Sequence, residues 1–173
     1  MCKPTYVALS QTLPCFLANA WLELFRRPDE ADVLRTQPER MPEAVEELLR
    51  HASPARAVFR RALAAISIGG ADVAPGDRVI LMLSAANHDP SRFPRPGRLD
   101  VRRDAAGHLA FGRGAHSCPG APAIRMAVAV ATGALLGLTS AVEPVGEVEW
   151  IGGFAIRAPA SLWVVLRREQ GDR

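Results

Sequence analysis

Apolar residues recur at helical spacing in three stretches of the chain, residues 12–25, 42–50 and 121–138. The first contains Pro14. Because proline is tolerated only in the first turn of a helix, we expect this helix to begin near Leu13 or to kink there. The second has its glutamates early and an arginine at its end, which matches the helix dipole. The third is apolar on nearly all sides, which predicts a buried helix.

Strands are predicted in two other parts of the chain. Residues 57–68 and 78–83 are rich in β-branched and large apolar residues, and glycines and prolines between them provide turns. Residues 148–166 alternate loosely and predict a strand pair. Residues 89–107 are crowded with proline, arginine and aspartate, which indicates a long loop of the kind that is usually functional. We therefore expect a mixed α+β fold, mainly helical, with one domain covering residues 1–173.

Composition and charge exclude several classes of protein. The chain has 173 residues, of which 49% are apolar and 23% charged, so it can bury a core and is not disordered or collagen-like. Its net charge of +3 is spread over single or paired arginines, without the dense basic stripe of a nucleic-acid groove. The longest apolar run, residues 126–138, is shorter than the roughly 20 residues that span a bilayer, and the start of the chain lacks the pattern of a secretory signal. These features favour a cytoplasmic protein that binds neither nucleic acid nor a membrane.

The stretch with the clearest chemical character is residues 111–120. It is a glycine-punctuated loop that places Cys118 just ahead of the predicted third helix. The helix dipole and the free backbone N–H groups there favour a thiolate over a thiol. Cys2, Cys15 and Cys118 are odd in number and scattered, so they form neither a disulfide framework nor a Cys-x-x-Cys zinc pair. On these grounds Cys118 is a candidate nucleophile, redox switch or metal ligand.

The spacing of Phe111, Gly114, His116, Cys118 and Gly120 resembles the haem-binding loop of the cytochrome P-450 superfamily. The resemblance implies haem b as cofactor and Cys118 as the axial thiolate ligand of its iron. It also implies that His116 and Arg113 face a haem propionate. The other expected cofactor-binding positions of this loop are Phe111, Gly112 and Gly120. A buried cysteine in a glycine loop without a ligand is the structural alternative.

Other parts of the chain follow the order of the same family. Glu47 and Arg50 match its Glu-x-x-Arg pair, which the resemblance implies is completed by Arg98 of the long loop and holds the loop that presents Cys118. Taken alone, this pair is ordinary ion pairing on a helix surface. Arg60 matches the arginine that reaches a haem propionate from the sheet. Its structural alternative is a solvated residue on a strand edge.

Residues 8–12 lie where the family has its oxygen-groove motif. The resemblance implies that the hydroxyl of Thr12 steadies iron-bound dioxygen. Leu9 stands where the family has glycine, and Gln11 stands where it has the acid that feeds protons. Because glutamine has no proton to deliver near neutral pH, we expect proton delivery to be impaired.

The resemblance extends over almost the whole chain, which corresponds to less than half of the family's domain. It implies a partial cytochrome P-450 fold and a truncated haem-thiolate monooxygenase. Such an enzyme oxidises a small organic substrate with dioxygen and with electrons from NAD(P)H, delivered by a ferredoxin-type redox partner. Two alternatives remain open. One is a non-catalytic haem-binding or auxiliary subunit, with another protein covering its open distal face. The other is a degraded remnant.

Overall fold

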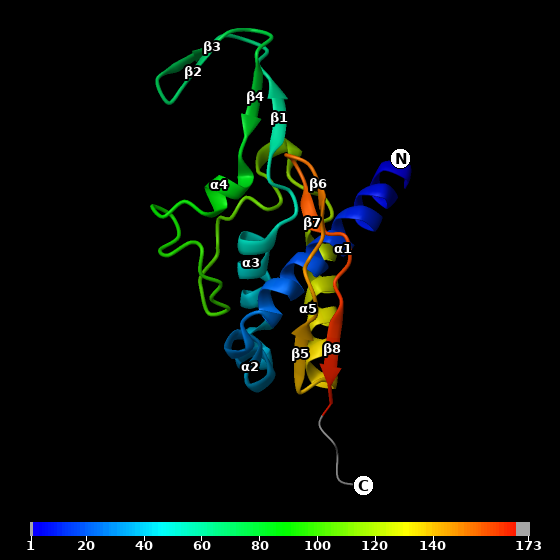
Figure 1. Cartoon of the computed structure of the whole chain (residues 1–173). Coiled ribbons are helices and arrows are strands. Elements are labelled where there is room, and N and C mark those ends of the chain that lie inside the picture. The colour runs from blue at the N-terminus through cyan, green and yellow to red at the C-terminus, as the bar shows by residue number, and fades with distance from the viewer. Residues whose placement is uncertain (1, 169–173) are drawn as a thin grey trace.

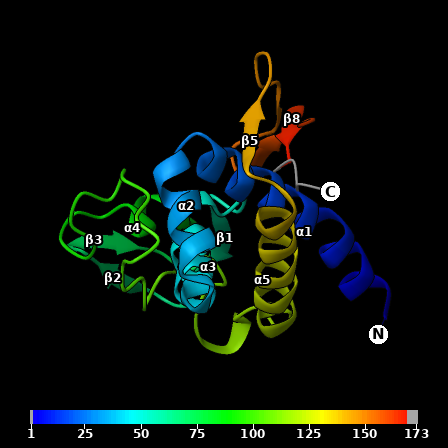
Figure 2. The same cartoon turned by 90° about the horizontal axis from the view of Figure 1, so that it is seen from below.

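Three helices form the centre of the molecule (Figures 1 and 2). The computed structural model describes residues 2–168, and their side chains from residue 10 onward. The long helix α1 (Cys2–Phe25) packs against α3 (Met41–Ala52), and α3 packs against α5 (Ala121–Leu138). The shorter helical elements are α2 (Pro28–Thr36), α4 (Leu83–Asn87) and the 3-10 turns η1 (Pro38–Arg40) and η2 (Gly114–His116).

The strands form four separate antiparallel pairs. Strand β1 (Val58–Arg61) pairs with β4 (Arg78–Leu81), and β2 (Ile66–Ile68) pairs with β3 (Ala71–Val73). Strand β5 (Ala141–Pro144) pairs with β8 (Val164–Arg167), and β6 (Trp150–Gly152) pairs with β7 (Arg157–Pro159). The β2–β3 hairpin extends away from the helices (Figures 1 and 2). Its two-residue turn is Gly69–Gly70, and both glycines have positive φ, which is the conformation that a tight hairpin requires.

The core lies where the three central helices meet. It includes Ala20 and Leu24 from α1, Leu48 from α3 and Val128 from α5, all of them almost fully buried. Leu99, in the long loop after α4, joins the same cluster. The core therefore holds the loop as well as the helices.

The predicted helix over residues 121–138 is confirmed with the same bounds as α5. The expectation that this helix is buried holds for one face only, because Met126, Val130 and Leu138 are each about two-thirds exposed. In the described part of the chain α5 alone is long and apolar enough to cross a membrane by length and composition. Since it packs against α2 and α3 through a buried face, we describe it as a helix of the core.

Other boundaries differ in part from the predictions. Helix α1 begins well before Leu13 and continues through Pro14, which lies inside it, and α2, which was not predicted, begins at Pro28. The long loop is confirmed: residues 88–113 contain neither helix nor strand. Within residues 148–166 the β6–β7 pair is confirmed, whereas β8 pairs with β5, which was not predicted.

Candidate functional site

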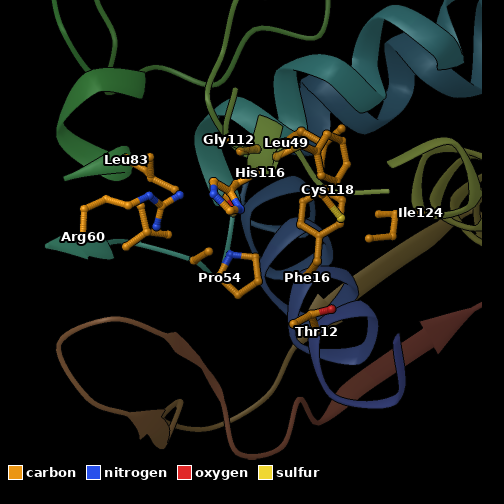
Figure 3. Close-up of a pocket in the computed structure, with 15 residues that line it drawn as sticks. Thr12, Phe16, Leu49, Pro54, Arg60, Leu83, Gly112, His116, Cys118 and Ile124 are labelled. Atoms are coloured by element: carbon orange, nitrogen blue, oxygen red, sulfur yellow. The ribbon is translucent and has the colours of Figure 1, made fainter. Parts of the chain in front are cut away.

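A largely apolar cavity of about 250 Å³ lies between α1, the end of α3, strand β1 and the loop that contains Cys118 (Figure 3). Apolar side chains from all four regions form most of its wall. Polar groups occur at a few positions, and some of the lining side chains are exposed, so the cavity is open to solvent. The residues that line it include Thr12, Phe16, Leu49, Arg60, Phe111, Gly112, His116, Cys118 and Ile124.

The cavity brings together six residues that the sequence analysis selected, from three distant parts of the chain. They are Thr12, Arg60, Phe111, Gly112, His116 and Cys118. Cys118 and Arg60 lie at opposite sides of the cavity in Figure 3, with His116 between them and Thr12 below on α1. Within the described residues, Arg113 and Gly120 are not part of its lining. Arg113 is exposed, and Gly120 lies at the start of α5.

Backbone hydrogen bonds fold the cysteine loop back on itself. The N–H of Cys118 donates to the carbonyl of Phe111 at 2.9 Å, and the Cys118 carbonyl accepts the N–H of Ala121, the first residue of α5, at 3.3 Å. Gly112 and Gly114 have φ values of +66° and +78°, which side chains rarely adopt. The half-buried Cys118 is therefore held at the cavity wall immediately before a helix.

The chemistry of this donor set fits a haem. A flat, apolar macrocycle requires apolar walls, which Phe16, Leu49 and Ile124 supply, and an axial ligand, which the Cys118 thiolate can supply. Its two carboxylates require cationic or N–H partners, and the exposed side chains of Arg60 and His116 line the same cavity. Arg60 donates one hydrogen bond from Nη1 to the carbonyl of Phe59 at 2.8 Å.

The predicted Glu47–Arg50 pair is buried in the structure rather than exposed on the helix surface. Arg50 donates to both carboxylate oxygens of Glu47, from Nε at 2.7 Å and from Nη2 at 2.8 Å, and neither side chain is exposed. Arg50 also donates to the carbonyls of Asn87 at 2.8 Å and Pro96 at 3.0 Å. The pair thus connects α3 to α4 and to the long loop.

The expectation that Arg98 completes this pair is wrong. The loop arginine that reaches Glu47 is Arg103, whose Nε lies 3.1 Å from Oε1, while the Arg98 side chain is exposed. Arg98 contributes its carbonyl, which accepts a hydrogen bond from Arg103 at 3.3 Å. Residues 98, 102 and 103 are all arginine in a segment without periodicity, so nothing in the local sequence indicated which one turns inward.

Sequence reasoning also missed a polar cluster beside the cysteine loop. Glu46 on α3 contacts Arg125 of α5 and His108 of the long loop. The hydrogen bond from Arg125 is the main reason that the pKa of Glu46 is lowered, and burial lowers the pKa of His108. Asn87, the last residue of α4, is buried, and its side chain accepts the Leu109 N–H at 2.7 Å. His108 and Arg125 flank the glycine loop in sequence, which is the one local signal that pointed to them.

Thr12 and Gln11 face different environments on α1. Thr12 lines the cavity and is partly buried, whereas Gln11 is exposed. The hydroxyl is therefore at the cavity, and the residue in the position of the expected acid is on the outside of the helix.

Comparisons with known proteins agree with this geometry. The cytochrome P-450 family model matches residues 35–138. The cytochrome P-450 monooxygenase PikC of Streptomyces venezuelae is 38% identical over 96% of this chain, and 6-deoxyerythronolide B hydroxylase of Saccharopolyspora erythraea is 41% identical over 66% of it.

Solved structures give the same result. The tirandamycin C-bound P-450 monooxygenase TamI superposes with a TM-score of 0.85 at 41% identity, covering 88% of this chain and 39% of its own. CYP109B1 of Bacillus subtilis gives 0.87 at 35% identity, covering 91% and 43%. The chain spans about 42% of the length of PikC and 28% of the hydroxylase. The match of the family model, together with these superpositions, shows that the chain belongs to the cytochrome P-450 family.

Proposed function

We propose that this chain forms the haem-binding side of a haem-thiolate monooxygenase, with Cys118 as the axial ligand of the iron. The observation that carries the proposal is the single cavity that gathers Cys118, His116, Arg60 and Thr12 from three distant parts of the sequence. When haem b is bound, it supplies the chemistry by which dioxygen oxidises a small organic substrate. Arg60 and His116 bind its propionates, and the apolar wall excludes water from one of its faces.

The residues on α1 define the other side of this proposed site. Thr12 lines the cavity, and we assign to its hydroxyl a hydrogen bond to a polar ligand of the proposed site. Gln11 is exposed and carries no ionisable proton, so it does not act as a proton donor. Proton delivery in this chain therefore depends on water that enters the open cavity.

The proposed partners follow from the chemistry and from the relatives. A monooxygenase needs two electrons per turnover, and we assign their delivery from NAD(P)H to a ferredoxin-type carrier in the cytoplasm. The relatives are named for small organic molecules: one is a 6-deoxyerythronolide B hydroxylase, and another was solved with tirandamycin C bound. These names support a small organic molecule as the substrate class.

A second candidate function is a haem-binding subunit whose open face is covered by another protein. Large apolar side chains near the cavity are exposed, including Phe59 at 54%, Ile80 at 48% and Phe154 at 56%. The rings of Phe59 and Phe154 lie 6.4 Å apart, so they form a continuous apolar surface rather than isolated residues. Exposed apolar surface of this kind marks an interaction site or an aggregation risk.

The carbon-monoxide difference spectrum of the reduced, haem-loaded chain tests the proposed ligand. We expect the red-shifted band of a thiolate-ligated haem, its loss in Cys118→Ser, and its retention in Cys15→Ser. Cys15 is the matched control because it lies on α1 outside the cavity lining. A spectrum that Cys118→Ser leaves unchanged contradicts the assignment.

A further inference from the structure

Glu46 joins three segments that are distant in sequence. From α3, its Oε1 accepts from Nε of Arg125 at 2.6 Å and its Oε2 accepts from Nη2 of the same residue at 2.9 Å. This is a bidentate pair, the geometry that gives a carboxylate and a guanidinium a fixed mutual orientation. Oε2 also lies 3.1 Å from Nε2 of His108. One carboxylate therefore fixes a side chain of α5 and a side chain of the long loop.

The hydrogen bonds of His108 define its protonation state. The N–H of Ala110 donates to Nδ1 of His108 at 3.1 Å, so Nδ1 carries no proton. The proton is then on Nε2, which donates to Glu46. The imidazole is neutral, in agreement with the lowered pKa that its burial causes. His108 thus connects Glu46 to the backbone one residue before Phe111.

Arg125 connects Glu46 to the ring of Phe111. Its guanidinium carbon lies 4.8 Å from the ring centroid, within the range of a cation–π contact, and the His108 ring is 6.1 Å from the same centroid. The carbonyl of Phe111 accepts the N–H of Cys118 at 2.9 Å. Contacts therefore run without a gap from Glu46, through Arg125 and His108, to Phe111 and Cys118.

The segment between Phe111 and Cys118 has little else to hold it. Residues 113–117 are exposed, and Gly112 and Gly114 adopt positive φ. Glycines lose more backbone freedom on ordering than any other residue, so this segment needs its two ends fixed. At the Phe111 end, the fixing groups are the Asn87 side chain on Leu109 and the Glu46 contacts.

We propose that Glu46 is a positioning residue for the cysteine ligand: through Arg125 and His108 it holds Phe111 where its carbonyl fixes the Cys118 backbone. The role of Cys118 as haem ligand rests on the proposed function, but the ordering of the loop does not require haem. Loss of the Glu46 charge releases the guanidinium and the imidazole together and loosens the loop while the core stays folded.

Amide hydrogen exchange of the haem-free, full-length chain tests this inference separately from the proposed function. In Glu46→Gln we expect the Cys118 amide to exchange about tenfold faster, which corresponds to about 1.4 kcal/mol, because a charge-assisted contact is lost. Core amides of α1, such as those of Leu22 and Leu24, are expected to stay within about twofold of the parent. A merely structural role predicts instead that all these amides accelerate together.

Two further variants complete the experiment. Arg125→Lys keeps the charge but loses the bidentate fork and the planar contact with Phe111, so we expect it to resemble Glu46→Gln. Glu43→Gln is the matched control, because Glu43 lies on the same helix, is exposed, and contacts only Arg40, at 3.2 Å, among the ion pairs of the described residues. We expect it to leave the exchange of Cys118 unchanged.

Haem loading then reports on the ligand itself. We expect Glu46→Gln to lower the thiolate-ligated fraction of the reduced carbon-monoxide complex, and Glu43→Gln to leave that fraction unchanged. The proposal is overturned if Glu46→Gln exchanges its Cys118 amide at the parent rate, or if Cys118 and the α1 core accelerate equally. If the parent chain shows no thiolate-ligated haem, the proposed function fails, while the exchange result for the loop stands by itself.

Discussion

Replacing Glu47 with alanine is expected to destabilise the chain more than any change to a surface carboxylate. Its side chain is not exposed, and it accepts hydrogen bonds from Arg50, from Arg103 and from the N–H of Asp100 at 3.1 Å. Glu47→Ala removes the carboxylate that binds both arginines and leaves the Arg50 guanidinium buried without this counter-charge. Breaking a buried ion pair in this way costs about 3–5 kcal/mol.

The structure places the cost at the lower end of that range. Arg50 keeps the carbonyls of Asn87 and Pro96 as acceptors, and Arg103 keeps the carbonyl of Pro94 at 2.8 Å. We therefore expect about 3 kcal/mol, a large part of a typical domain stability of about 5–15 kcal/mol. With a urea dependence of about 2 kcal/mol per molar, the unfolding midpoint falls by about 1.5 M.

Urea unfolding of the full chain, followed by circular dichroism, measures this effect. Glu43→Ala is the control. The Glu43 side chain is 62% exposed, and it pairs only with Arg40 among the ion pairs of the described residues, so we expect a loss of about 0.5 kcal/mol. Glu47→Gln retains an acceptor of the same shape and is expected to lie between parent and Glu47→Ala, which keeps the comparison measurable if the alanine variant does not fold. A Glu47→Ala midpoint within about 0.5 M of the parent refutes the reasoning.

The same assay distinguishes the two loop arginines: Arg103→Ala is expected to lower the midpoint clearly, whereas Arg98→Ala, which retains its carbonyl, leaves it near the parent value. In acid, the pKa of Glu23 is about 2 instead of 4.5, mainly because His51 and Arg27 hydrogen-bond to it. Since the pKa of Glu23 is lower in the folded state, its carboxylate stabilises the fold above pH 4.5, and this stabilisation is lost as the pH falls towards 2. In Glu23→Gln the free energy of unfolding should therefore depend less on pH in that window. Haem titration should show about tenfold weaker binding for Arg60→Ala, and little change for its neighbour Arg61→Ala, because only Arg60 lines the cavity. When the haem-loaded chain receives electrons from NAD(P)H through a redox partner, we expect more peroxide than hydroxylated product for each NAD(P)H consumed, because the cavity is open to water. Gln11→Glu should not restore coupling of NAD(P)H consumption to product. Tight coupling in the unmodified chain would show that this openness does not matter.

Much of the local structure could be predicted from the sequence. The bounds of α5 follow from an apolar run that begins after Gly120, and the start of α3 follows from Pro42. The glycine loop before Cys118 could be located because its residues are contiguous, so their spacing alone specifies the turn. Helix periodicity and turn chemistry act over a few residues, and that is why they can be read without the fold.

Contacts between distant segments could not be predicted in the same way. The family resemblance implied Arg98, but the structure brings Arg103 to Glu47, 56 residues away along the chain. The loop after α4 has no periodic pattern, and its path is determined by Leu99 and Val101, which are buried in the helical core. The neighbouring arginines take their directions from that packing.

The amino-acid sequence by itself determined the bounds of α5, the glycine turns and the cysteine that can ligate a metal, because each depends on propensities and spacing within one short segment. The tertiary structure alone decided that Thr12, Arg60 and Cys118 share a cavity, and that Glu46 meets Arg125 and His108. It also decided that α5 exposes a row of apolar side chains, since burial depends on what packs against a helix and not on its composition. These three features have the same physical reason. A contact between distant residues depends on the free energy of packing the whole core, and the sequence of one short segment does not specify that packing.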